Sequence, residues 1–232
     1  MKISVLIIAH NEEKYIGKCI ESVLNQIKKA DEIVLLLHNS TDETLLIAQK
    51  YPITIISWNA GNQPCDARIE GLRHISGDII LCTDGDSFAE KNWIEVLSLL
   101  LEKGNILVGS WVKFQGTFYS SLANLWNRYF CVSKGKKATR FIWGSSMAFW
   151  GKDKEKVREI FVESIKCAKE LNLSMIAEDY QLALAMVKKG NIEVTNKTFV
   201  TAVEKEKSSF KAHLRSNENL KNGAKIRKAL NL

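Results

Sequence analysis

Two aspartates stand one residue apart at the end of an apolar run, and this spacing is the clearest chemical signal in the sequence. The run Ile79 to Thr83 predicts a short buried strand, and Asp84 and Asp86 follow it. A buried parallel strand delivers its carboxyl end to the crevice where α/β sheets bind ligands. Two carboxylates there repel each other unless a cation lies between them, and a divalent cation that holds a phosphate group meets this need. A solvated turn after a strand is the alternative that the pair alone leaves open.

The elements that must position these aspartates belong to an alternating first half of the chain. Strands are predicted at residues 3–8, 32–37, 53–57 and 78–83, and helices at 12–26, from 40 to about 50, and at 65–75. Ser40 and Glu43 have the spacing of a capping box at the start of the second helix. Four strands that alternate with three helices predict a parallel, doubly wound sheet with right-handed crossovers.

The second half of the chain is less regular. Further helices are predicted at residues 92–101, 152–171 and 178–189, and further strands at 106–114 and 192–203. Residues 115–140 mix aromatic and basic side chains without a clear period, and a turn at Trp143 to Ser146 precedes an apolar run. Beyond Phe210 we expect a basic helix with sparse apolar anchors, which are Leu214, Leu220, Ile226 and Leu230.

Composition is that of a globular protein, with 232 residues, of which 46% are hydrophobic and 25% charged. The five cysteines are odd in number and form no Cys-x-x-Cys pair, which argues against a disulfide framework and against a zinc site. A reducing, cytoplasmic location fits this usage. The apolar N-terminal run leads directly into a helix pattern and does not predict a signal peptide. No apolar run approaches the roughly 18 residues of a membrane span.

Positive charge is concentrated in two places, although the net charge is only +7. Residues 204–232 hold eight basic and three acidic side chains. A second basic cluster consists of Arg128, Lys134, Lys136, Lys137 and Arg140. Such clusters indicate an anionic surface or an anionic substrate, with a solvated face as the open alternative.

Six short motifs occur in the order that is typical of family 2 glycosyltransferases, and the chain resembles this family over about residues 3–190. The motifs are Ser4 to Glu13, Asn39 to Asp42, Ala67-Arg68 with Gly71, the strand from Gly77 that ends in Asp84-Gly85-Asp86, Trp143 to Phe149, and Ala177-Glu178-Asp179. The resemblance implies an α/β fold, a single GT-A (Rossmann-like) domain over residues 1–203 with a mostly parallel central sheet flanked by helices. Residues 1–112 would form its nucleotide-sugar-binding half and 113–203 its acceptor-binding half, followed by a basic tail at 204–232.

The resemblance also implies roles for individual residues. Asp86 would be the direct ligand of Mg²⁺ or Mn²⁺, and Asp84 would help through the ribose or a water. The donor contacts would be Ala9, His10, Asn11, Glu12, His38, Arg68, Asp84 and Gly85. Asp179 would be the general base with support from Glu178, and Trp143 and Gly144 would lie beside the acceptor.

Local structure offers an alternative reading for several of these residues. Asn11 could cap a helix, Arg68 could be a surface charge, and two acids such as Glu178 and Asp179 favour a helix N-terminus through its dipole. Trp143 could be a core residue.

The sequence also departs from the family pattern. Relatives usually carry an aspartate that reads the base after the second strand, where this chain has His38. Uracil recognition by a carboxylate is therefore in doubt, and the His38 ring could take its place. Ile69 replaces a usual asparagine, and His213 in the tail is a weaker candidate for reaching the metal.

The expected function is the inverting, metal-dependent transfer of a sugar from a nucleotide diphosphate-sugar to a hydroxyl or phosphate acceptor that is a glycan or lipid-linked. The basic clusters predict docking on the inner membrane face. A non-catalytic nucleotide-sugar-binding relative stays open because the base-reading aspartate is missing. A nucleotidyltransferase is disfavoured, because residues 9–13 are acidic where a Gly-rich basic loop is expected. No nucleic-acid motif is present, so no nucleic-acid partner is expected.

Overall fold

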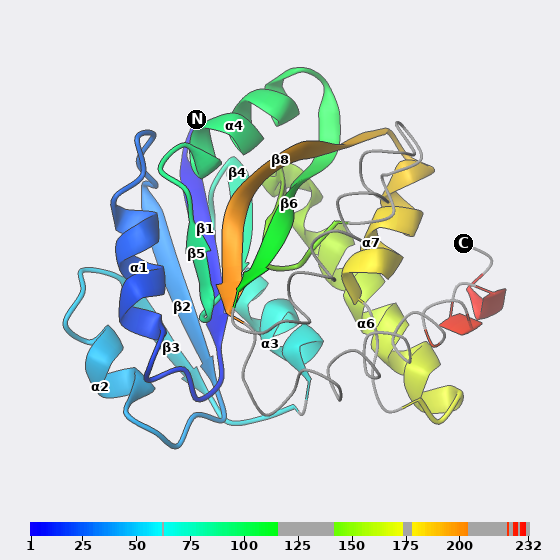
Figure 1. Cartoon of the computed structure of the whole chain (residues 1–232). Helices are drawn as coiled ribbons and strands as arrows, with labels where there is room; N and C mark the ends of the chain where they lie inside the picture. The colour runs from blue at the N-terminus through cyan, green and yellow to red at the C-terminus, as the bar shows by residue number, and fades with distance from the viewer. Residues whose placement is uncertain are drawn as a thin grey trace.

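A computed structural model describes residues 1–61, 63–115, 142–173 and 178–203, together with residues 222, 225–226 and 228–230 of the tail. The described residues form one eight-stranded sheet with helices packed on both faces (Figure 1). The strands follow the order β3-β2-β1-β4-β7-β6-β8-β5. The expectation of an α/β fold with a central sheet flanked by helices is confirmed.

The first half of the sheet is parallel, as the alternating pattern predicts. It consists of β1 (Ile3–Ala9), β2 (Glu32–His38), β3 (Thr54–Trp58) and β4 (Ile79–Asp84). All seven residues of β1 are buried, because the strand is covered by helices on both faces. Ile8 of β1 pairs with Leu36 of β2 and with Asp84 of β4, so the carboxyl ends of these three strands lie side by side.

The second half of the sheet is mixed. It consists of β5 (Ser87–Ala89), β6 (Asn105–Gln115), β7 (Met147–Trp150) and β8 (Asn191–Val203). β7 runs antiparallel to both β4 and β6, whereas β6 and β8 are parallel. The short β5, which the sequence patterns do not predict, pairs antiparallel with β8 directly after the two aspartates.

Helices divide between the two faces and build two core clusters. One face carries α1 (Ile16–Leu24), α2 (Thr44–Ala48) and α4 (Trp93–Glu102), and the other carries α3 (Pro64–Gly71), α6 (Lys154–Glu170) and α7 (Glu178–Val187). Two short 3-10 turns, η1 (Leu72–His74) and η3 (Gly151–Asp153), follow α3 and precede α6. In Figure 1, α1 and α2 lie at one end of the sheet and α6 and α7 at the other.

The second predicted helix differs from its expectation. The Ser40 hydroxyl accepts the Asn11 N–H at 3.1 Å, while the Asp42 carboxylate accepts the Thr44 N–H at 3.0 Å. The predicted capping box of Ser40 and Glu43 is therefore wrong, and α2 shortens to five residues. Ser40 thus bonds to the loop after β1, and Asp42 bonds both to the start of α2 and to Glu13 of that loop.

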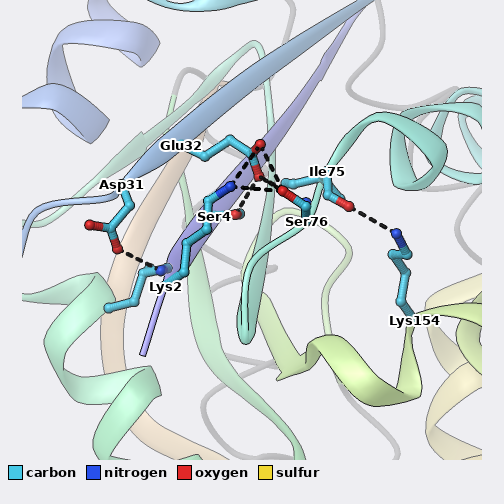
Figure 2. A network of polar contacts seen from close by, with 8 residues as sticks. Lys2, Ser4, Asp31, Glu32, Ile75, Ser76 and Lys154 are labelled. Carbon is cyan, nitrogen blue, oxygen red and sulfur yellow. Dashed lines mark hydrogen bonds and ion pairs between the residues drawn. The ribbon is translucent and has the colours of Figure 1, made fainter.

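A polar network ties the amino-terminal edge of the sheet together (Figure 2). The Glu32 carboxylate accepts the Ser4 hydroxyl at 2.5 Å, the Ser76 N–H at 2.8 Å and the Lys2 ammonium at 3.3 Å. Lys154 donates to the Ile75 carbonyl oxygen at 2.9 Å from the neighbouring η3–α6 junction. These contacts hold the starts of β1, β2 and β4 in register, at the edge opposite to their carboxyl ends.

The described part of the tail contacts the domain. Ile226 is completely buried and Leu230 packs against the same core cluster as α6 and α7. The rest of the predicted tail, and the basic cluster from Arg128 to Arg140, lie outside the described residues. Among the described helices, none has both the length and the apolar character that crossing a membrane requires.

Candidate functional site

The carboxyl ends of β1, β2 and β4 open into a pocket of about 180 Å³. Its lining residues come from these strands, from the loops after them and from the start of α3. They are Ile8, Ala9, His10, Glu12, His38, Pro64, Ala67, Asp84, Gly85 and Asp86. The pocket lining thus brings together six of the eight residues for which a donor contact is expected. Asn11 and Arg68 do not line it, and Asp86 does.

The loops after β1 and β2 are bonded to each other. Asn11 has a φ of 55°, and its side-chain oxygen accepts the Thr41 N–H at 2.8 Å. The Glu12 N–H donates to the Thr44 hydroxyl at 2.7 Å, and the Glu13 N–H donates to Asp42 at 3.1 Å. Asn11 therefore links the loop after β1 to the loop after β2, and these bonds hold one wall of the pocket in place.

His38 lines the pocket with an imidazole that is held on two sides. Its ring stacks on Trp58 at a centroid distance of 5.4 Å, and its Nε2 lies 3.1 Å from the Gly61 carbonyl oxygen. The Asn39 side-chain nitrogen lies 3.1 Å from the same Nε2 and donates to the Gly61 carbonyl at 3.0 Å, so these contacts together hold the ring in place. His10, which is exposed, donates from Nδ1 to the His38 carbonyl at 2.7 Å.

The turn between Asp84 and Asp86 requires a glycine. The Gly85 N–H donates to the Ile8 carbonyl at 2.8 Å, and a Cβ on Gly85 would lie 2.7 Å from the Ala9 Cβ. The Asp86 carbonyl accepts the Val203 N–H at 3.0 Å, which ties the turn to the end of β8. Both aspartate side chains are half-buried beside the pocket.

Arg68 joins the aspartate loop to the acidic pair of the second half. It lies on α3, is 4% exposed, and donates from Nη2 to Asp84 Oδ1 at 2.6 Å. Its Nη1 forms a short ion pair with Glu178 Oε1. Among the described residues, no hydrogen-bond partner is present for its Nε. Arg68 is therefore neither a surface charge nor a pocket-lining residue, and its pKa lies above the ordinary value because Asp84 and Glu178 outweigh its burial.

Glu178 and Asp179 are the first two described residues of α7, and burial raises the pKa of both carboxyls. Burial raises the pKa of Glu178 to about 7, against the opposing effect of Arg68. Burial likewise raises the pKa of Asp179, whose carboxylate accepts the Gly144 N–H at 3.1 Å and the Tyr180 N–H at 2.8 Å. A carboxylate with a raised pKa is suited to accept a proton.

The Trp143-Gly144 turn closes the site on the side of α7. A Cβ on Gly144 would lie 2.4 Å from Arg68 Nη2, so the glycine backbone packs directly against the guanidinium. Trp143 meets Phe114 edge-on at a centroid distance of 5.3 Å. Its buried indole Nε1 lacks a hydrogen-bond partner within the described part of the chain.

Several residues of this site were given no site role by the sequence analysis. Asp42 and Thr44 support the pocket wall, Trp58 supports His38, and Pro64 lines the pocket at the first position of α3. A proline at the start of a predicted helix is a recognisable signal, whereas the other three act only through contacts between distant segments. His213 lies outside the described residues.

A divalent metal at this site would take some of its ligands from the substrate. No group of three or more His, Cys, Asp or Glu side chains that could hold a metal is found among the described residues. Mg²⁺ is commonly bound by one or two carboxylates together with phosphate oxygens and waters. The oxygen ligands of Asp84 and Asp86 fit that pattern, although Arg68 already contacts one Asp84 oxygen.

The sheet and its flanking helices have the fold of the GT-A glycosyltransferases. Staphylococcus aureus TarS in complex with UDP-GlcNAc superposes with a TM-score of 0.64 at 18% identity, over 89% of this chain and 59% of that chain. Glucosyl-3-phosphoglycerate synthase from Mycobacterium tuberculosis, in complex with Mn²⁺, UDP and phosphoglyceric acid, superposes with a TM-score of 0.61 at 20% identity, over 92% and 75% of the two chains. At these identities the likeness shows the fold.

Sequence comparison establishes the family. The family model for glycosyl transferase family 2 matches residues 4–161, and the chain belongs to this family. The glycosyltransferase GlyA of Streptococcus pneumoniae serotype 4 is 31% identical over 129 residues, which are 51% of this chain and 18% of GlyA. The cholesterol galactosyltransferase of Borreliella burgdorferi is 34% identical over 102 residues, 41% of this chain and 28% of that protein. The chain thus matches less than a third of the length of these two relatives.

Proposed function

We propose that this glycosyltransferase moves a sugar from a nucleotide diphosphate-sugar to a hydroxyl or phosphate acceptor, in a metal-dependent reaction that inverts the anomeric centre. One observation carries the proposal. A pocket with two half-buried aspartates meets the acidic pair of Glu178 and Asp179, whose pKa values are raised, at one edge of the sheet, and Arg68 joins them through Asp84 and Glu178. Residues 1–112 supply the donor side of this site and residues 113–203 the acceptor side.

The donor is proposed to lie in the pocket after β1, β2 and β4. His38 presents an imidazole ring, which can form a hydrogen bond to a base, where an aspartate reads the base in family members. The backbone of residues 9–12 would hold the diphosphate side, because the bonds between the two loops fix its position. The UDP that is bound in TarS and in the mycobacterial synthase supports a uridine donor as the first one to test.

Asp86, with help from Asp84, is proposed to hold Mg²⁺ or Mn²⁺. When bound, the ion would neutralise the charge that develops on the diphosphate leaving group. The Mn²⁺ that is present in the mycobacterial synthase supports this choice. The neighbouring Gly85 keeps the aspartates against β1, since no other residue fits between it and Ala9.

Asp179 is proposed to be the general base. It takes the proton from the acceptor hydroxyl while that oxygen attacks the anomeric carbon, and the bond from this carbon to the diphosphate oxygen breaks with its electron pair. A single displacement inverts the anomeric centre. The Gly144 N–H orients the Asp179 carboxylate, and Trp143 lies next to it as a flat surface for an acceptor sugar or lipid.

A screen of donors tests the proposal first. Thermal shift and donor hydrolysis would be measured with UDP-, GDP- and dTDP-sugars, with and without Mn²⁺ or Mg²⁺, on the wild type and on Asp86→Ala. We expect a metal-dependent shift with one donor that disappears in Asp86→Ala and persists in Glu159→Gln, a change at an exposed position of α6. A wild type that shifts with none of these donors would overturn the proposal.

Membrane docking is a separate part of the proposal. The basic tail and the cluster from Arg128 to Arg140 are proposed to place the enzyme on the inner membrane face, where each basic residue contributes on the order of 1 kcal/mol. Lys225 and Lys228 of the tail are exposed, while Ile226 between them is buried in the core. Sedimentation at low salt with anionic and with neutral vesicles tests this idea, and equal binding to both would refute it.

A non-catalytic nucleotide-sugar-binding relative is the second candidate. It is favoured by His38 at the base-reading position and by the ion pair that occupies one oxygen of Asp84. The raised pKa of Asp179 favours catalysis instead. Donor binding without hydrolysis or transfer across a broad panel of acceptors would support this second candidate.

A further inference from the structure

We propose that Arg68 is a positioning residue that couples the donor pocket to α7, so that the charge of Glu178 sets how strongly the pocket holds a metal–nucleotide. Glu178 does not line the pocket and contacts the guanidinium that also contacts Asp84. This inference rests on the proposed function, since it assumes that the pocket binds a nucleotide with a divalent metal.

The coupling starts from one cation that is shared by two acids from distant parts of the chain. Arg68 of α3 contacts Asp84 at the end of β4. It also contacts Glu178 at the start of α7, which lies 110 positions after Arg68 in the chain. At 4% exposure the guanidinium has almost no contact with water, and among the described residues its Nε has no partner. The two carboxylates are therefore what compensates its buried charge.

The surroundings leave Arg68 little freedom to move away from this position. The Gly144 backbone packs against the guanidinium so closely that a Cβ there would lie 2.4 Å from Nη2. The same Gly144 donates its N–H to Asp179, the proposed base. A change in the position of Arg68 would therefore alter the surroundings of both Asp84, on the metal side, and Asp179, the proposed base.

Competition between the two acids gives the coupling its sign. With Glu178 ionised, the positive charge of Arg68 is divided between two carboxylates, and Asp84 keeps part of its negative potential for a metal ion. Without the charge of Glu178, Arg68 pairs with Asp84 alone. A divalent cation must then compete with a stronger Arg68–Asp84 ion pair. By linkage, a cation at Asp84 must in turn strengthen the Arg68–Glu178 pair.

The test is the affinity of Glu178→Gln for UDP, measured by calorimetry with Mn²⁺ and again with a chelator, at about pH 8, where Glu178 is ionised. We expect the affinity with Mn²⁺ to fall about fivefold or more, in the range of typical coupling between sites. The affinity without metal should stay unchanged, because Glu178 does not line the pocket. Glu159→Gln is the matched control and should bind UDP as the wild type does in both conditions.

Arg68→Lys provides the second variant if Glu178→Gln fails to fold. Its single ammonium keeps the buried charge but cannot bridge both carboxylates. We expect the same loss with Mn²⁺, and Arg73→Lys, at a side chain that is 57% exposed in the next turn, should have no effect.

Each outcome separates the coupling from the proposed function. If the wild type binds UDP with Mn²⁺ and the folded variants bind it equally well, the coupling is wrong and the proposed function stands. If a variant loses affinity equally with and without Mn²⁺, the effect is a general distortion of the pocket, and the coupling is also wrong. If the wild type binds no nucleotide of the donor panel, the proposed function fails and the coupling fails with it.

Discussion

Asp84 and Asp179 are carboxylates of one site that the protein holds in different environments. Both are half-buried, but Asp84 at the pocket is paired with Arg68, whereas Asp179 at the start of α7 is bonded to two backbone N–H groups. Environments that separate two carboxyl groups in this way allow them to take different roles. Asp84 is suited to hold a cation, and Asp179 is suited to accept a proton.

Asp179→Asn should remove the base and keep the donor site. We expect the transfer rate to fall by about 10²- to 10⁴-fold, while the affinity for the donor nucleotide changes little, because Asp179 does not line the pocket. In the wild type the rate should rise with pH through a pKa above that of an ordinary aspartate, since only the ionised form accepts a proton. Steady-state kinetics over a pH series checks both points. An equal loss of nucleotide affinity would assign Asp179 to donor binding.

Glu178 predicts a dependence of stability on pH. Its pKa is raised from 4.5 to about 7 in the folded state, so the folded protein binds the proton more tightly than the unfolded chain. The resulting stabilisation is complete below pH 4.5 and is lost as the pH rises to about 7. Relative to Glu178→Gln, the free energy of unfolding of the wild type should therefore fall across this window. Urea denaturation of both proteins at several pH values would measure the difference, and parallel curves would contradict the prediction.

At the scale of elements, two loops that follow parallel strands act as one unit. Short polar side chains of the β2–α2 segment bond to backbone groups of the loop after β1, and α2 is left with five residues. Such a helix gains little from its own hydrogen bonds. The β2–α2 segment is instead stabilised by hydrogen bonds to the loop after β1, and these bonds also fix the pocket wall.

Asp42→Ala tests this arrangement. Its pKa is lowered because bonds from Thr44 and from the Glu13 N–H outweigh the effect of its partial burial, so its stabilisation is present above pH 3.8 and lost as the pH falls below that value. At neutral pH the variant should lose about 0.5–2 kcal/mol of unfolding free energy, as for other capping residues. Nucleotide affinity should weaken with it. Glu43→Ala, at an exposed neighbour, should leave both quantities near the wild-type values.

On the scale of the whole molecule, the two edges of the sheet have separate tasks. The carboxyl edge of β1, β2 and β4 carries the pocket, and the amino edge carries the network around Glu32. The sheet between them is buried on both faces. Changes at the amino edge should therefore affect stability and leave the chemistry of the pocket intact.

Glu32→Gln separates stability from function. The Glu32 pKa is lowered because the bonds from Ser4, Ser76 and Lys2 outweigh its partial burial. Loss of the charge should cost about 1–3 kcal/mol of unfolding free energy at neutral pH, and the cost should shrink below pH 4.5. Thermal denaturation and UDP binding would be compared with Glu159→Gln as the control. A folded Glu32→Gln protein with weakened UDP binding would show that the two edges are not independent.

Local patterns were sufficient for the strands of the first half and for most helices. The apolar runs at 3–8, 32–37 and 78–83 lie within one or two residues of β1, β2 and β4, since a strand buried on both faces leaves a continuous apolar signal. The three-residue β5 and the antiparallel placement of β7 were not predictable in this way. Such pairings depend on which distant strand offers a free edge, and no local period records that.

The sequence by itself determined that acidic motifs end a buried strand and begin a helix, and it determined the family to which these motifs belong. Only the tertiary structure decided that Arg68 joins Asp84 to Glu178 and that Gly144 packs against the guanidinium. The physical reason is that strand and helix signals arise from neighbouring residues along the chain. The ion pairs of Arg68 arise from packing that brings α3, β4 and α7 to one edge of the sheet.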